Sequence, residues 1–205
     1  MFSLQSLKSF VYYRTQSVDQ PIRAKNRGGL APGLISLIFG LGLSIDLHAQ
    51  DFSIAPYKPL ISLYQQAVAG DEGARDKAAE GFRRLLDADP QDPVATVYLG
   101  STQALEGRDA WMPWNKMKHT ERGLDTMARA IKLLQPQHDR LLIDGLPLSA
   151  EVKSIGAITF TEVPAFFNRF DQGYQLLQQL TRSELLTPVP FQRKAFIYFY
   201  AGKAA

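Results

Sequence analysis

The side chains best suited to acid–base chemistry lie in one short segment, residues 108–119. Asp109, Lys116 and His119 supply a carboxylate, an amine and an imidazole, the groups that general acid–base catalysis uses. If they converge in a closed pocket that shifts their pKa values, the segment would hold the site of an enzyme or carrier. His138 stands 19 positions from His119 in no metal-ligand pattern, and we expect both histidines at the surface.

Other signatures of catalysis are missing from the sequence. It contains no GxSxG, HExxH or GxxxxGK motif, and the glycines of residues 40–42 lie inside an apolar run where no nucleotide-binding loop could work. The chain has no cysteine, which excludes disulfides, thiolate metal ligands and cysteine nucleophiles. We therefore expect no catalytic residue, no metal site and no cofactor.

The segment from Arg108 to Lys116 also contains both tryptophans of the chain, Trp111 and Trp114. Tryptophan is enriched at the hot spots of interfaces, so an exposed ring here would mark a contact. The interpretation we favour is that the segment folds back on the helices and buries at least one of the two rings.

A second aromatic stretch covers residues 164–170. At helical spacing Phe166 and Phe170 share a face, which favours packing in the core. Residues 191–200 are apolar on several sides of a predicted helix. A deep cavity lined by the aromatic residues of 164–200 would instead indicate a carrier of hydrophobic ligands.

The elements that must position these groups are predicted to be helices. Apolar residues recur at spacings of three and four through most of the chain after residue 60, and glycine or proline separates the runs. No alternating stretch requires a sheet, and residues 137–147 are expected to form a loop. The pattern predicts seven helices, over about 60–69, 74–87, 93–107, 120–134, 148–160, 164–182 and 191–205.

Residues 93–107, PVATVYLGSTQALEG, resemble the first helix of a tetratricopeptide repeat (TPR). Leu99 and Gly100 stand in the middle of the helix, and Gly107 follows seven residues later at its end. The segment before this helix resembles the closing half of a repeat, at Ala78, Phe82, Asp89 and Pro90. The segment after it resembles a second closing half, at Gly123, Met127, Ala130 and Pro136. The end of the chain resembles the opening half of a further repeat, at Tyr198, Ala201 and Gly202.

The resemblance implies an all-α fold, a right-handed α-solenoid of about three TPR-like helical hairpins plus a terminal helix. Paired helices would cross closely at small residues, namely Ala78, Gly100, Gly123 and Gly202. The closing prolines Pro90 and Pro136 are 46 residues apart, whereas the family's period is about 34 residues. An insertion is therefore expected around residues 108–119. A generic array of helical hairpins is the alternative.

By analogy of fold, the resemblance implies a non-catalytic scaffold or adaptor that binds a protein or peptide partner. Its contacts would lie on the concave face, formed by the first helix of each pair, and in the tryptophan-containing segment. The expected contact residues are Tyr64, Gln65, Thr96, Gln103, Trp111, Trp114 and Lys153.

Residues 30–45, LAPGLISLIFGLGLSI, form an apolar run without a charge, preceded by the cations of residues 23–27 and followed by a small residue at Ala49. These are the parts of a secretory signal peptide, which predicts cleavage near Ala49 and export to the periplasm or secretion. The predicted organisation is a leader over 1–49 and a helical repeat domain over 50–205. The alternatives are a buried helix and an uncleaved N-terminal anchor, which would be the protein's only membrane contact.

The charge distribution argues against nucleic acid as the partner. The chain carries 23 lysines and arginines and 20 aspartates and glutamates, a formal net charge of +3. Residues 1–49 hold five of the cations and two of the anions, so 18 of each remain in residues 50–205. A body that is formally neutral offers no general attraction to a phosphate backbone.

Overall fold

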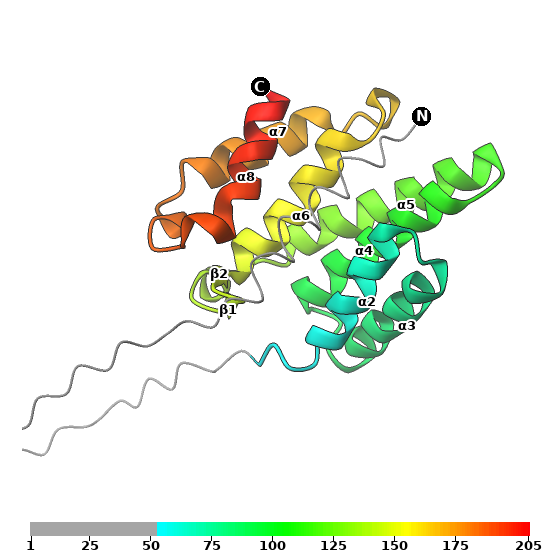
Figure 1. Ribbon diagram of the computed structural model, residues 1–205, viewed down its shortest axis with the longest axis horizontal. Helices are drawn as coiled ribbons and strands as arrows, with labels where there is room; N and C mark the ends of the chain where they lie inside the picture. The colour runs from blue at the N-terminus through cyan, green and yellow to red at the C-terminus, as the bar shows by residue number, and fades with distance from the viewer. Residues whose placement is uncertain (1–52) are drawn as a thin grey trace, which may run out of the picture.

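The structure, a computed structural model, describes residues 53–205, which are built almost entirely from helices (Figure 1). The predicted leader lies outside the described residues. The described residues form seven α-helices, the number predicted: α2 (Lys58–Ala69), α3 (Glu72–Ala88), α4 (Pro93–Asp109), α5 (Pro113–Lys132), α6 (Leu148–Glu162), α7 (Phe170–Thr181) and α8 (Phe191–Ala204). The shorter elements between them are η1 (Pro136–Asp139), β1 (Leu142–Ile143), β2 (Leu146–Pro147), η2 (Ala165–Phe167) and η3 (Glu184–Leu186). The all-α fold class is confirmed.

The first helices begin and end where the sequence places capping residues. Asp71 accepts a hydrogen bond from a backbone amide in the first turn of α3. Asp92 accepts from two backbone amides at the start of α4, where Pro93 occupies the first turn. Gly70 ends α2 with a φ of 117°, a left-handed conformation that glycine adopts without strain.

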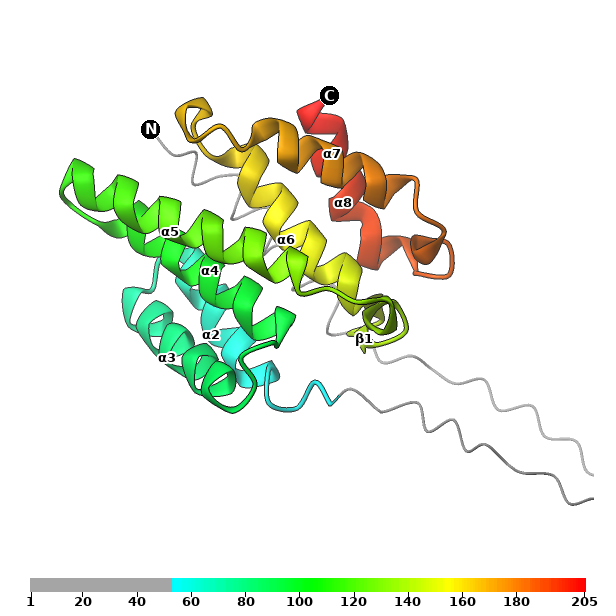
Figure 2. The same cartoon turned by 180° about the vertical axis from the view of Figure 1, so that it is seen from behind.

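The helices lie in two layers. Each helix packs against the next one in the chain, and α2, α4, α6 and α8 also pack against one another in that order. This second series of contacts brings these four helices to one side, with α3, α5 and α7 on the other. The two views agree, since α8 covers α7 in Figure 1 and α7 covers α8 in Figure 2.

Helix α4 is enclosed on all sides. It contacts α2, α3, α5 and α6, and every residue from Pro93 to Gln103 is buried. A helix hidden in this way needs no polar face. This explains why apolar and small residues surround α4 instead of forming a single stripe.

The close crossing predicted from the small residues is present between α4 and α5. A methyl group added to Gly123 would lie 2.5 Å from the carbonyl oxygen of Gly100, and one added to Gly100 would lie 2.8 Å from that of Gly123. Near the end of α4, a methyl group on Gly107 would overlap the Thr120 hydroxyl. The two backbones are therefore in direct contact, and no larger residue fits at these glycines.

A similar contact joins α6 and α7. A methyl group added to Gly173 would lie 2.7 Å from the carbonyl oxygen of Ala157. The prediction of a close approach at Gly202 is wrong, because nothing lies within 4 Å of an added methyl group there. Helix α8 buries the side that carries Phe196 and Tyr200, which leaves Gly202 facing open space.

The prediction of an insertion around residues 108–119 is wrong. Helix α4 continues to Asp109 and α5 begins at Pro113, so only residues 110–112 link them. Both helices are longer than predicted, at 17 and 20 residues. In the first turn of a helix a proline has no amide hydrogen bond to lose, so Pro113 starts a helix instead of breaking one.

The helix predicted over 164–182 begins later than expected. Ala165–Phe167 form a short 3₁₀ turn, Asn168 takes a left-handed conformation with a φ of 54°, and α7 starts only at Phe170. Asparagine visits that conformation more readily than most residues, and here it ends the turn. The aromatic residues before α7 therefore lie in a loop and not on a helix face.

A small hairpin in the predicted loop of residues 137–147 is an unexpected element. Strands β1 and β2 pair antiparallel, and Asp144 and Gly145 turn between them with φ values of 49° and 80°. Two successive positive φ values on an Asp-Gly pair are typical of a type I′ turn. This pair between apolar residues is the sequence signal that predicts the hairpin.

Gly123→Ala is expected to destabilise the fold, because its methyl group would press on the Gly100 carbonyl and force α4 and α5 apart. The free energy of unfolding should fall by about 1–3 kcal/mol, the usual result of overpacking. Gly202→Ala is the matched control, since its methyl group meets open space and alanine favours a helix, so stability should be unchanged or slightly higher. Urea unfolding followed by circular dichroism measures both, and a Gly123→Ala variant of normal stability would contradict the close crossing.

Candidate interaction surfaces

The groups that could do acid–base chemistry do not converge. Asp109 accepts hydrogen bonds from Arg75 at 2.5 Å and from Arg108 at 2.6 Å. Lys116 donates to the backbone carbonyl of Arg108 at 3.0 Å, and the His119 ring lies 3.0 Å from a carboxylate oxygen on α4. Asp109 pairs with the Arg108 side chain, Lys116 with the Arg108 backbone carbonyl and His119 with Glu106, so within the described residues no hydrogen bond joins these three side chains to one another.

Arg108 instead ties three helices together at the base of the turn between α4 and α5. Its guanidinium donates to the carbonyl oxygens of Ala67 and Val68 at the end of α2, at 3.0 and 3.1 Å. Asp109 pairs with it and also with Arg75 of α3. The last carbonyls of a helix lack partners inside the helix. Arg108 bonds the Val68 carbonyl and adds a second hydrogen bond at the Ala67 carbonyl, which also accepts from the Gly70 amide. The Arg108 side chain is only 7% exposed, so the link is a buried structural one.

A buried tyrosine connects α4 to three neighbouring helices. The Tyr98 hydroxyl donates to a carboxylate oxygen of Glu151 on α6 at 2.6 Å. Its ring stacks on Phe82 of α3 and meets Tyr64 of α2 edge-on, with both pairs of ring centroids 5.2 Å apart. The Tyr64 hydroxyl in turn lies 2.8 Å from the Ser101 hydroxyl. Tyr98 therefore joins four helices by apolar packing and by a hydrogen bond to an acidic group.

The residues expected to form contacts on the concave face fall into two groups. Tyr64, Thr96 and Gln103 are 8% exposed or less, and each makes a hydrogen bond within the protein. Gln65 and Lys153 are half-buried. Lys153 lines a surface depression of about 510 Å³ together with polar side chains of α7 and of the two residues that follow it. The role of all five residues in binding stays a prediction.

Both tryptophans are exposed, so the prediction that at least one ring is buried is wrong. Trp111 is 86% exposed and Trp114 is 62% exposed, and Met117, one turn further along α5, is 53% exposed. The linker of residues 110–112 is too short to fold back over the helices. The rings therefore face solvent at the end of the α4–α5 hairpin.

The aromatic residues near α7 are also more exposed than predicted. Phe166 is 61% exposed and Phe170 is 42% exposed, although Phe167 packs partly against the core. The break before α7 removes the shared helix face on which the prediction of core packing depends. On α8, Phe191 and Phe199 are exposed as well, which agrees with the apolar character predicted on several sides of this helix.

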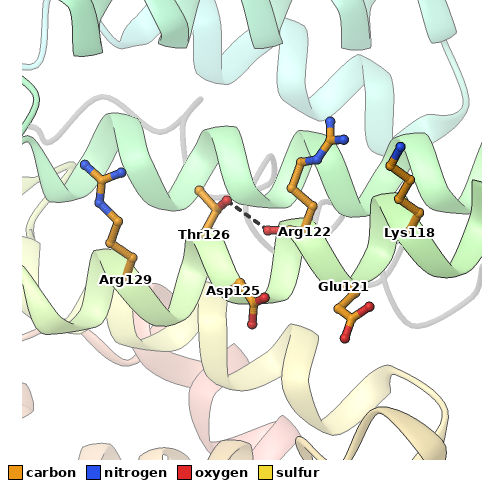
Figure 3. Close-up of a pocket in the computed structure, with 6 residues that line it drawn as sticks. All are labelled: Lys118, Glu121, Arg122, Asp125, Thr126 and Arg129. Atoms are coloured by element: carbon orange, nitrogen blue, oxygen red, sulfur yellow. Dashed lines mark hydrogen bonds between the residues drawn. The ribbon is translucent and has the colours of Figure 1, made fainter.

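A depression of about 440 Å³ lies along α5 (Figure 3). Lys118, Arg122 and Arg129 extend to one side of the helix, whereas Glu121 and Asp125 extend to the other. The side chains of Lys118 and Arg122 form no ion pair or hydrogen bond with any described residue, while Arg129 donates to a backbone carbonyl before α4. Spacings of four and seven residues place these three cations on one side of the helix, and a search for the spacing of apolar residues does not detect them.

His138 accepts a hydrogen bond that its protonation would break. Its Nδ1 atom accepts from the backbone amide of Gln135 at 2.9 Å, which closes the turn η1. Burial lowers the pKa of His138 below its ordinary value, although the carboxylates of Asp139 and Asp92 oppose the shift. A histidine pKa that is lower in the folded state means that protonation favours the unfolded state.

The free energy of unfolding should therefore decrease when the pH is lowered. The decrease should begin near the ordinary histidine pKa of about 6.5 and end below the lower pKa of folded His138. A His138→Asn variant cannot take up this proton, so it should lose that part of the pH dependence. His119→Asn is the matched control and should retain it. Urea unfolding at a series of pH values measures the profile, and a profile that His138→Asn leaves unchanged would rule out this origin.

No family model, curated protein or solved structure matches this chain. Within residues 53–205, no group of three or more histidine, aspartate or glutamate side chains is arranged to hold a metal ion. None of the helices in that range combines the length and the apolar character needed to cross a bilayer.

Proposed function

We propose that this protein is a non-catalytic scaffold or adaptor of the cell envelope that binds a protein or peptide through a TPR-like helical array. The observation that carries the proposal is the series of contacts α2–α4–α6–α8, which groups the first helix of every pair. Stacked helical hairpins produce such a series and use it as an extended binding surface. In this proposal the helices form a right-handed superhelix with those four helices on its concave side. The enclosed helix α4 supports this wall from beneath, and α2 and α6 carry the accessible side chains.

The glycine contacts give the repeat interpretation further support. In the α4–α5 hairpin Gly100 meets Gly123, and in the α6–α7 hairpin Ala157 meets Gly173. In each case a small residue of the first helix allows the backbone of the second to approach. Similar contacts in successive hairpins are what repeats of one structural unit would produce.

The side chains along the proposed wall suit a protein or peptide partner. Tyr64, Tyr98 and Glu151 run across α2, α4 and α6 and are held by hydrogen bonds. We assign them to the supporting floor of the wall, because their polar atoms are already engaged. Gln65 and Lys153 are more accessible and are the proposed contacts.

The alternative functions have less support. An enzyme or carrier with its site in residues 108–119 needs Asp109, Lys116 and His119 to converge, whereas all three are engaged by Arg108 or Glu106 and no hydrogen bond links them to one another. A carrier of hydrophobic ligands needs a deep apolar cavity, whereas the two described depressions are lined by charged and polar side chains. The envelope location depends on the predicted leader. A purified chain whose mass corresponds to a start near Gln50 would support cleavage of this leader.

A photo-crosslinking amino acid placed at Gln65, on the proposed wall, should capture a protein or peptide from envelope extracts. The same amino acid at Lys132, exposed on α5 in the other layer, should capture much less of it. Mass spectrometry of the captured material identifies the partner, and circular dichroism checks that both variants are folded. Equal capture at the two positions, or none at either, would argue against a binding wall formed by the first helices.

A further inference from the structure

The free end of the α4–α5 hairpin has features that the proposed scaffold function does not use. Both tryptophans lie there, Trp111 at 86% and Trp114 at 62% exposure, with Met117 close by at 53%. In both views of the fold, this turn projects beyond the neighbouring helices (Figures 1 and 2). Exposed apolar surface of this kind, with two indole rings three residues apart on a projecting turn, is typical of interaction sites.

The α5 side of this end carries cations that have no ion-pair partner among the described residues. Residues 110–120, AWMPWNKMKHT, contain two lysines and a histidine and no acidic residue, although His119 pairs with Glu106 of α4. Lys118 and Arg122 form no ion pair with any described residue, and Glu121 extends from the other side of α5 (Figure 3). Asp109, just before the turn, is already paired with two arginines. Lys118, one helical turn along α5 from Trp114, is therefore free to interact with an anion.

The turn is also held in place from within. Lys116 donates to the Arg108 carbonyl at 3.0 Å and so bridges the two sides of the turn. Arg108 is fixed on the end of α2, and Gly107 lies directly against Thr120. A base that is already ordered loses little conformational entropy when the exposed rings bind.

We propose that this end of the hairpin, residues 110–118, seats on the surface of a lipid bilayer that contains anionic lipids. Tryptophan concentrates at membrane–water interfaces, where the ring lies among the headgroups and its N–H stays hydrogen-bonded. Anionic headgroups attract neighbouring lysine and arginine side chains. A convex projection fits a flat, deformable bilayer, whereas a protein partner would need a matching hollow. This contact is separate from the scaffold function and does not depend on it.

Tryptophan fluorescence tests the proposal directly, because both tryptophans of the chain lie in this turn. Their emission reports on the turn alone, even when another segment of the full chain reaches the membrane. Vesicles of phosphatidylcholine and phosphatidylglycerol should shift the emission to shorter wavelength, and brominated acyl chains in these vesicles should quench it. Vesicles of phosphatidylcholine alone should have a weaker effect.

Substitution of the nearby cation should weaken the contact by a defined amount. Lys118→Gln should raise the lipid concentration for half-maximal quenching about fivefold, the loss expected for one cation near an anionic surface. Lys132→Gln is the matched control, since it removes an exposed lysine at the other end of the same helix, and it should leave that concentration unchanged. Equal effects of the two substitutions would overturn the role of charge at the turn.

Single substitutions of the rings complete the test. Trp111→Ala leaves Trp114 as the probe, and Trp114→Ala leaves Trp111. Each substitution should reduce the quenching of the remaining tryptophan by the brominated lipids. Phe191→Ala on α8 should leave the quenching unchanged. Absence of any emission shift or quenching in wild-type protein would overturn the proposal, and so would quenching that both tryptophan variants retain. An emission shift caused by envelope proteins but not by vesicles would replace the bilayer with a protein partner. None of these results bears on crosslinking at Gln65, which tests the scaffold function independently.

Discussion

The backbone contact between α4 and α5 is the constraint on which the rest of the structure depends. Gly100 and Gly123 bring the two helices together with no side chain between them, so turning either helix would drive bulky neighbours into the gap. The remaining faces of α4 therefore pack against α2, α3 and α6. Within the described chain, every helix touches α4 or touches α6, which α4 positions.

The polar side chains that stand out in the sequence mainly hold helices together. Arg108 satisfies the end of α2, and Tyr98 links α4 to Glu151 on α6. Such groups are paired because a buried charge or hydroxyl without a partner would destabilise the fold. A carboxylate or an amine in the sequence is therefore weak evidence of chemistry until its partners are known. Here the exposed side chains, not the buried polar ones, are the candidates for function.

Local signals predicted much of this fold. Asp92 and Pro93 mark the start of α4, Gly70 marks the end of α2, and Gly100 indicates the close crossing, because each acts through its own backbone or nearest neighbour. The failures involve information from further away. Whether Trp111 is buried depends on the length of the linker beside it, and Pro113 can either end one helix or begin the next. Both questions are decided by how far α4 and α5 continue along each other, which local patterns do not report.

The order of the helices has a consequence for how the chain folds. Each helix makes its main contacts with the one before and the one after it, so most pairings close short stretches of chain. Proteins dominated by such local pairings fold quickly, because little loop entropy is lost before contacts form. We expect the α4–α5 hairpin to form first, because its helices are long and its linker has only three residues. Structure would then spread from it in both directions, toward α2 and toward α8.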